Sequence, residues 1–121
     1  MRRRVLIVDD DDRYLEGMRE LLESAGYEAI TAASFEAGKR AISDRQPHLL
    51  ILDVQLGPHN GFQFISTGEH KIRAILVTGF DDPVLRADAA NFGARFLVKP
   101  VDPNALLSVI QQELDSAEVA R

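Results

Sequence analysis

The sequence has no cysteine and no long run of apolar residues. A chain of 121 residues buries enough surface to be stable without disulfide bonds, so the lack of cysteine fits a reducing compartment. The apolar run after the basic N-terminus lasts only from Val5 to Val8, which is too short for the core of a signal peptide. No other stretch approaches the length of a membrane span. We therefore expect one cytoplasmic domain over residues 1–121 that does not contact a membrane.

The sequence also lacks a net positive charge and a glycine-rich turn. Its formal net charge is -5 at pH 7, which gives no electrostatic reason to expect binding to nucleic acid. The arginines at positions 2, 3 and 4 are expected to flank a buried strand and to remain solvated. The turn after the first apolar run reads DDDDR, with no glycine for the close approach of a pyrophosphate and with the wrong charge for one. A dinucleotide-binding enzyme is therefore set aside.

Short apolar runs alternate with helix-like stretches along the whole chain. The runs are rich in branched or aromatic side chains and predict five strands: Val5–Val8, Ala29–Ala32, Leu49–Leu52, Ala74–Val77 and Phe96–Val98. None alternates with polar residues, which is typical of parallel strands that are covered on both faces. Strand followed by helix, five times over, predicts an α/β fold: a doubly wound five-stranded parallel sheet with helices on both faces.

Two helices are predicted before the third strand. Apolar residues recur at steps of three and four from Tyr14 to Ala25, and Gly26 follows as a left-handed stop. Ser34 is the expected cap of a second helix that runs to about Asp44.

Two further helices are predicted from a shared signal in the last third of the chain. Asp82–Pro83 and Asp102–Pro103 each place a capping carboxylate before a proline whose fixed φ suits the first helical turn. Gly93 is expected to close the fourth helix, and the fifth is expected to end near Asp115, with a polar tail from about Ser116.

Polar residues follow four of the five apolar runs, at the point where each run ends. They are two acids after the first run, an acid after the third, a hydroxyl after the fourth and an amine after the fifth: Asp9 and Asp10, Asp53, Thr78, and Lys99. Because the carboxyl ends of parallel strands lie on one edge of a sheet, and ligands bind there in open α/β sheets, we expect these groups to form one site.

Carboxylates gathered in this way need a cationic partner. Two of them about 4 Å apart repel by roughly 4 kcal/mol at an effective dielectric constant near 20. Lys99 supplies one positive charge, and Mg²⁺ is the natural second partner because it takes oxygen ligands from carboxylates, water and a substrate phosphate. The predicted site therefore binds Mg²⁺ and a phosphoryl group. Taken singly, each of these residues is also typical of a helix cap or of a solvated strand end.

The motifs LIVDD, LLILDVQLGPHNG, ILVTG and FLVKP carry these residues, and through them the sequence resembles the receiver domain of two-component response regulators over essentially its whole length. The resemblance implies a flavodoxin-like fold with strand order 2-1-3-4-5 and five helices. It also implies a phosphoprotein of bacterial signal transduction that is not an enzyme, apart from its own phosphorylation and dephosphorylation.

The resemblance assigns the acidic residues to phosphoryl and metal chemistry. Asp53 matches the phosphoacceptor, and Asp9 and Asp10 match acids that bind Mg²⁺ together with it. Gln55 matches the position whose backbone carbonyl completes the metal site and whose side chain helps to set the lifetime of the phosphoryl group.

The resemblance also assigns residues that bind or report the phosphoryl group. Thr78 matches a switch hydroxyl that hydrogen-bonds one phosphoryl oxygen, and Lys99 matches a cation that pairs with another. Phe96 matches an aromatic residue that changes rotamer on activation, and Gly79 a small residue beside the acceptor. The Lys99–Pro100 bond is expected to be cis, which costs little only before proline.

Two departures from the family pattern bear on the third helix and its loop. Asp53 and Thr78 are 25 positions apart. This is about five fewer than is usual in the family, or a little over one turn at about 3.6 residues per turn. A third helix starting near Gly61 should therefore be short or irregular, with residues 66–71 as a loop. Gly57 stands where the family has proline, and Pro58 follows, which changes the expected loop conformation.

The principal hypothesis is Mg²⁺-dependent transfer of a phosphoryl group to Asp53 from a histidine kinase or a histidine phosphotransfer protein. The new bond to Thr78 and an inward turn of Phe96 would then switch the surface of the fourth helix, fifth strand and fifth helix. One alternative is a docking module that works without phosphorylation, which the shortened third helix favours. Another is a Mg²⁺-dependent aspartyl phosphatase, which wants an acid where Gln55 stands.

Beyond the phosphodonor, two other partners are considered. One is a second copy of the chain, bound through the fourth helix, fifth strand and fifth helix. The other is an output domain, which applies if the chain is the receiver of a longer protein and not a complete single-domain regulator. The spacing of His48, His59 and His70 does not suggest a metal site, so we expect surface or loop residues at all three positions.

Overall fold

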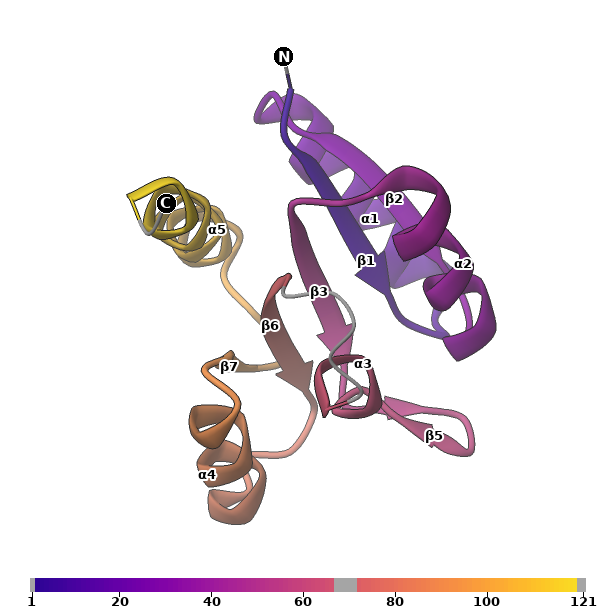
Figure 1. Ribbon diagram of the computed structural model, residues 1–121, viewed down its shortest axis with the longest axis vertical. Coiled ribbons are helices and arrows are strands. Elements are labelled where there is room, and N and C mark those ends of the chain that lie inside the picture. The colour runs from indigo at the N-terminus through magenta and orange to yellow at the C-terminus, as the bar shows by residue number, and fades with distance from the viewer. Residues whose placement is uncertain (1, 67–71, 120–121) are drawn as a thin grey trace.

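A computed structural model describes residues 2–66 and 72–119 of the chain, and it has a parallel sheet at its centre. Five strands pair in the order β2-β1-β3-β6-β7, which is the expected order 2-1-3-4-5 (Figure 1). All four pairings are parallel. The strands are β1 (Arg4–Val8), β2 (Glu28–Ala32), β3 (Leu49–Asp53), β6 (Arg73–Thr78) and β7 (Arg95–Val98).

Helices cover both faces of this sheet, as the doubly wound fold predicts. They are α1 (Asp12–Ser24), α2 (Phe35–Arg45), α3 (Gln63–Ser66), α4 (Pro83–Asn91) and α5 (Pro103–Val119). Val5 and Ile7 belong to the core cluster on the side of α1 and α5, whereas Leu6 and Val8 belong to the cluster on the side of α2, α3 and α4. All four are fully buried, which explains why the sequence of β1 shows no polar alternation.

Three predicted helix starts are confirmed by their capping bonds. Ser34 accepts a hydrogen bond from the backbone N–H of Ala37 at α2. Asp82 caps α4, and the Asp102 carboxylate accepts from the backbone N–H of Ala105 at α5.

The predicted glycine stops are confirmed as well. Gly26 has a φ of 96° after α1, and Gly93 has a φ of 73° after α4. These are left-handed conformations that glycine adopts without steric cost, so the chain can leave both helices sharply.

Two features differ from the sequence-based expectation. Helix α5 runs to Val119 rather than ending near Asp115, because Ile110 and Leu114 anchor its preceding turns to the core and no proline or glycine follows before the end of the helix. A two-stranded antiparallel hairpin, β4 (Gln55–Leu56) with β5 (His59–Asn60), follows β3 and is not predicted by the sequence pattern.

Helix α3 covers four described residues, Gln63–Ser66, and because residues 67–71 lie outside the described part of the chain, the shortening of the third helix stays a prediction. Of the loop expected at residues 66–71, only Ser66 is described, and it is helical. Phe64 of α3 is buried and packs against α2 at Gly38, where a Cβ atom would lie only 2.8 Å from the Phe64 ring. Within the described parts of the chain, no helix has the length and apolar character needed to cross a membrane.

Candidate functional site

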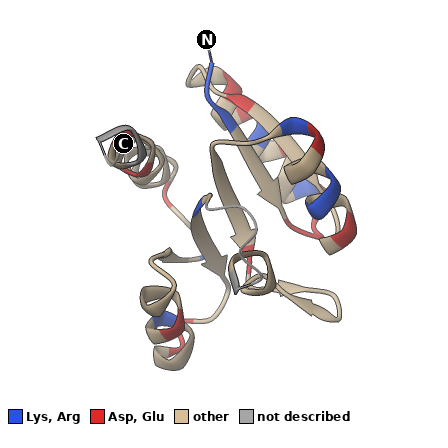
Figure 2. Ribbon diagram, viewed as in Figure 1, with Lys and Arg blue, Asp and Glu red and all other residues tan. Residues whose placement is uncertain are grey.

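Three carboxylates meet at the edge of the sheet where β1 and β3 end. Asp9, Asp10 and Asp53 each offer an oxygen, and these oxygens lie within 4.8 Å of one another. Strands β1 and β3 are neighbours in register, with Val8 opposite Leu52, so the chain continues from both into the same corner. Figure 2 shows acidic residues at the ends of these two strands. The predicted convergence of the acids is confirmed.

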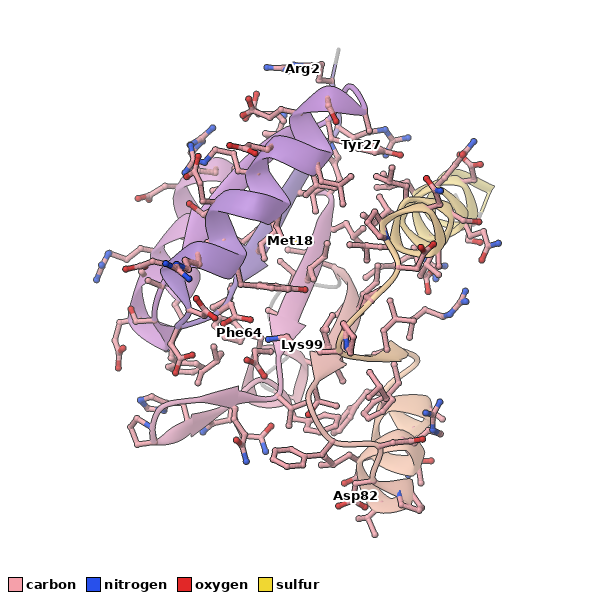
Figure 3. All side chains as sticks on the ribbon, turned by 180° about the vertical axis from the view of Figure 1, so that it is seen from behind. Arg2, Met18, Tyr27, Phe64, Asp82 and Lys99 are labelled. Carbon is pink, nitrogen blue, oxygen red and sulfur yellow. The ribbon has the colours of Figure 1, made fainter. Side chains whose placement is uncertain are left out.

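Lys99 joins two of these carboxylates. Its Nζ atom lies 2.9 Å from Oδ2 of Asp9 and 3.4 Å from Oδ2 of Asp53. The Asp9 side chain is only 2% exposed, so its charge depends on this partner rather than on water. The backbone N–H of Lys99 donates to the carbonyl oxygen of Thr78 at 2.7 Å, which ties the end of β7 to the end of β6. Figure 3 shows Lys99 at the centre of the molecule, beside the carboxyl end of the sheet.

Burial and neighbouring charges shift the pKa values of Asp53 and Lys99. Burial raises the pKa of Asp53, and the backbone N–H of Gln55 and the charge of Lys99 only partly oppose this. Burial by itself lowers the pKa of Lys99, but the hydrogen bond to Asp9 and the charges of Asp9 and Asp53 outweigh it, so the pKa of Lys99 is raised overall. Lys99 therefore stays a cation, whereas burial disfavours the negative charge on Asp53.

The four consecutive acids after β1 have different roles. Asp9 is buried in the site, and its Oδ1 atom accepts a hydrogen bond from the backbone N–H of Asp11. Asp10 is exposed and belongs to the carboxylate cluster. Asp11 caps α1 by accepting from the backbone N–H groups of Arg13 and Tyr14, and Asp12 lies in the first turn, where the helix dipole favours an acid.

Residues at both ends of the β4–β5 hairpin contact Asp53. The Oδ1 atom of Asp53 accepts a hydrogen bond from the backbone N–H of Gln55 at 3.1 Å. Gly61, just after the hairpin, donates its backbone N–H to the carbonyl of Val54 at 2.7 Å. A Cβ atom at Gly61 would collide with the backbone oxygen of Asp53. The backbone of Asp53 is therefore held by contacts with residues at both ends of the hairpin, and the Gln55 side chain is exposed beside it.

The remaining predicted residues lie in β6 and β7 or directly after these strands. Thr78 is buried at the end of β6, and its hydroxyl oxygen accepts a hydrogen bond from the backbone N–H of Phe80. Gly79 is exposed, and a Cβ atom there would meet nothing within 4 Å. Phe96 is half-buried on the α4 side, with the Arg86 guanidinium 4.8 Å from its ring centroid. The Lys99–Pro100 bond is cis, as the resemblance implies.

Tyr14 is a site residue that the sequence pattern did not reveal. It reads as one more apolar position of α1, but its ring centroid lies 4.2 Å from Nζ of Lys99. Burial raises the pKa of the Tyr14 hydroxyl, which therefore stays neutral. Nothing in the sequence pairs residue 14 with residue 99, because the contact forms only when the fold brings the first turn of α1 close to the residue that follows β7.

The donor set suits a hard divalent cation. Asp9, Asp10 and Asp53 are the one group of three or more potential ligand residues found among residues 2–66 and 72–119, and all their donor atoms are carboxylate oxygens. Such oxygens are the ligands that Mg²⁺ takes. His48 accepts a hydrogen bond from the backbone N–H of Arg4, and His59 stacks on Phe35, so both have structural contacts. His70 lies outside the described residues.

Comparison with known proteins identifies the family in which this arrangement occurs. Residues 5–111 match the family described as the response regulator receiver domain. The chain is 32% identical over 116 residues to the two-component response regulator PprB of Pseudomonas aeruginosa, with 89% of this chain and 42% of PprB covered. It is 27% identical over 112 residues to the photosynthetic apparatus regulatory protein RegA of Rhodobacter capsulatus, with 89% of this chain and 61% of RegA covered. The chain thus spans less than two thirds of these relatives.

Solved structures share the fold over the whole chain. A CheY-like response regulator receiver domain protein from Methanospirillum hungatei superposes with a TM-score of 0.92 at 30% identity and covers 100% of both chains. The signal receiver domain of an HD domain-containing protein from Pseudomonas fluorescens gives a TM-score of 0.89 at 27% identity, with 98% of this chain and 99% of that chain covered.

Proposed function

Because the chain belongs to the response regulator receiver family, we propose that Asp53 accepts a phosphoryl group from a phosphohistidine of a histidine kinase or of a histidine phosphotransfer protein. The observation that carries the proposal is the contact of Lys99 with Asp53 beside two further carboxylates. The carboxylate is the group to be modified, and the ammonium is the group that meets the new charge.

The transfer needs position and neutralisation of charge more than it needs a general base. An oxygen of Asp53 attacks phosphorus, the bond between phosphorus and the imidazole nitrogen breaks, and that nitrogen leaves with the bonding electron pair. The Gln55 N–H and the Gly61 contact keep the Asp53 backbone and one carboxylate oxygen in place. Lys99 already lies at the other oxygen and pairs with the phosphoryl group that forms there.

Asp9, Asp10, Asp53 and the backbone carbonyl of Gln55 would hold Mg²⁺. When bound, the ion supplies positive charge that offsets the three carboxylates and the incoming phosphoryl oxygens. Asp10 suits this role because it is exposed and has no lysine partner within the described residues.

Thr78 and Phe96 would link the charge of the phosphoryl group on Asp53 to a conformational change at the surface formed by α4, β7 and α5. The Thr78 hydroxyl now accepts from the Phe80 N–H, and it has a proton to donate to a phosphoryl oxygen beside it. Its movement would open room for Phe96, which is half-buried next to α4. The surface formed by α4, β7 and α5 is then the one that a second copy of the chain or an output domain would read.

The test is phosphorylation in the presence of a small phosphodonor. Purified protein is incubated with Mg²⁺ and acetyl phosphate, and the adduct is located by mass spectrometry after hydroxylamine treatment. We expect an acid-stable, hydroxylamine-labile adduct that Asp53→Asn abolishes and that the matched surface variant Asp44→Asn retains, since Asp44 is exposed on α2. EDTA should abolish it too.

Two results would overturn the proposal. An unmodified wild-type protein with small donors and with phosphohistidine donors would leave the docking-module alternative. Steady turnover of a phosphomonoester would instead favour the phosphatase alternative.

A further inference from the structure

We propose that Tyr14 is a positioning residue for Lys99. Its ring holds the Lys99 ammonium over the phosphoryl site when Asp9 and Asp53, which contact the ammonium in this structure, bind the metal ion or the phosphoryl group instead. The inference rests on the proposed function of Asp53 and adds a residue that the family motifs do not contain. The observation behind it is the 4.2 Å separation between the Tyr14 ring centroid and Nζ of Lys99.

Helix α1 fixes the ring in place. The backbone N–H of Tyr14 donates to the capping carboxylate of Asp11. The next core positions, Leu15 and Met18, are only 6% and 5% exposed. Tyr14 itself packs against the core cluster on the α1 and α5 side. The ring is thus part of the anchored N-terminal half of α1, and its orientation does not depend on the ligands of the site.

Among the described residues, the Lys99 ammonium contacts Asp9, Asp53 and Tyr14, and these three differ in what they can still do when the site holds a cation and a phosphoryl group. Asp9 and Asp53 hold the ammonium by charge, at 2.9 Å and 3.4 Å. Both carboxylates are also metal ligands in the proposed function, so their charge would be shared with the cation. Asp53 would in addition lose its free carboxylate on phosphorylation. The ring of Tyr14 binds no metal, and its negative face attracts an ammonium without competing for one of its N–H donors.

Geometry also restricts the direction in which Lys99 can move. The Lys99 backbone is tied to Thr78 by the 2.7 Å hydrogen bond, so only its side chain is free to swing. With the ring on one side and the carboxylates on the other, the ammonium stays at the edge where the phosphoryl group arrives. Removing the ring should leave the fold intact but let the ammonium leave this position.

The first test reads the contact in the metal-free protein, independently of phosphorylation. The Lys99 Hε protons, observed by NMR with Lys99→Arg as the assignment control, should lie upfield because of the ring current of Tyr14. Tyr14→Phe should keep this shift and Tyr14→Leu should remove it. Tyr27→Leu is the matched control, because Tyr27 is a half-buried tyrosine that lies toward the Arg2 end of the molecule, away from Lys99 (Figure 3).

The second test reads the consequence for phosphorylation. At saturating Mg²⁺, the rate of labelling by acetyl phosphate should fall about three- to tenfold in Tyr14→Leu, the size expected for a partly desolvated cation–π contact. Tyr14→Phe should restore the rate. In a Lys99→Ala background, Tyr14→Leu should have no further effect, because the ring acts through the ammonium.

The outcomes separate this inference from the proposed function. If wild type is labelled at Asp53 and Tyr14→Leu matches it in rate, or if the loss is the same size in the Lys99→Ala background, the positioning role is wrong. A loss that Tyr27→Leu reproduces at equal melting temperature would mean general destabilisation and would also overturn it. If wild type is not labelled at all, the proposed function fails, and the NMR test still decides whether the contact exists.

Discussion

Gly61 lies against the backbone oxygen of Asp53 so closely that a side chain at position 61 has no room. The contact holds the end of the β4–β5 hairpin against Asp53, the last residue of β3. It fixes the Asp53 main chain through packing rather than through the chemistry of its side chain. The position of the Asp53 backbone therefore depends on a residue eight places further along the chain, which has no functional group of its own.

Gly61→Ala is expected to lower the free energy of unfolding by about 1–3 kcal/mol, as overpacking in a tight contact does. The neighbouring atoms are backbone and cannot move aside as a flexible side chain would. Urea denaturation measures the change. Gly17→Ala is the matched control with the opposite sign, since Gly17 is exposed in α1 and an added methyl group would meet nothing within 4 Å. It should stabilise the protein by about 0.5–1 kcal/mol. Equal effects at the two positions would contradict the close contact.

Asp53→Asn is expected to stabilise the metal-free protein at neutral pH, raising the melting temperature by a few degrees. The reason is the raised pKa of Asp53, which burial causes. The Asp53 carboxyl keeps its proton to a higher pH in the folded protein than in the unfolded chain. The stabilisation that this protonation provides is therefore fully present below the pKa of Asp53 in the unfolded chain, and it is lost as pH rises through the pKa of Asp53 in the folded protein.

The pH dependence of this stabilisation by Asp53→Asn provides the control. The stability difference between Asp53→Asn and wild type should be largest near neutral pH and should shrink on acidification, as the wild-type carboxyl takes up its proton in the folded state. Thermal melts in EDTA across this range measure it. A difference that grows on acidification would show that the charge on Asp53 is favoured in the folded state.

Asp10→Asn is expected to weaken Mg²⁺ binding by at least about tenfold, which corresponds to roughly 1.4 kcal/mol. Asp10 is a member of the carboxylate cluster, whereas Asp12 lies in the first turn of α1 outside it. Asp12→Asn removes the same charge two residues away and should change the affinity by less than about threefold, since an exposed charge acts weakly at a distance. Calorimetric titration with Mg²⁺ measures both. Equal losses would mean that net charge, and not the cluster, holds the ion.

The sheet and the convergence of the acids could be predicted because both follow from local patterns. Apolar runs that end in polar residues reveal the strands, and parallel pairing brings Asp9, Asp53 and Lys99 to one edge whatever the loops do. Capping at Ser34 and Asp82 is local in the same way, since the capping group and its partner are three or fewer positions apart.

What the sequence did not reveal depends on packing between distant segments. The contact between Tyr14 and Lys99 joins α1 to the end of β7. The strands of the β4–β5 hairpin are too short to show an alternation of apolar and polar residues. The buried Glu113, paired with Arg73 at 3.1 Å, likewise reads as an ordinary polar position of α5. Each of these contacts is fixed only when two elements are docked, and no local pattern contains that information.

His59→Ala is expected to loosen the β4–β5 hairpin and to cost about 1 kcal/mol. The His59 ring stacks on Phe35 of α2 with centroids 4.3 Å apart and planes 17° apart, and its Nε2 atom lies 3.2 Å from a carboxylate oxygen of Glu36. These contacts tie the hairpin to α2 and so support the segment that bears Gln55. Loss of the ring should speed hydrogen exchange of the backbone amides at residues 55–60, measured by NMR in the metal-free protein. His59→Phe keeps the stack but not the contact with Glu36 and should retain most of the protection. Equal exchange in His59→Ala and wild type would show that the hairpin is held by its own backbone hydrogen bonds alone.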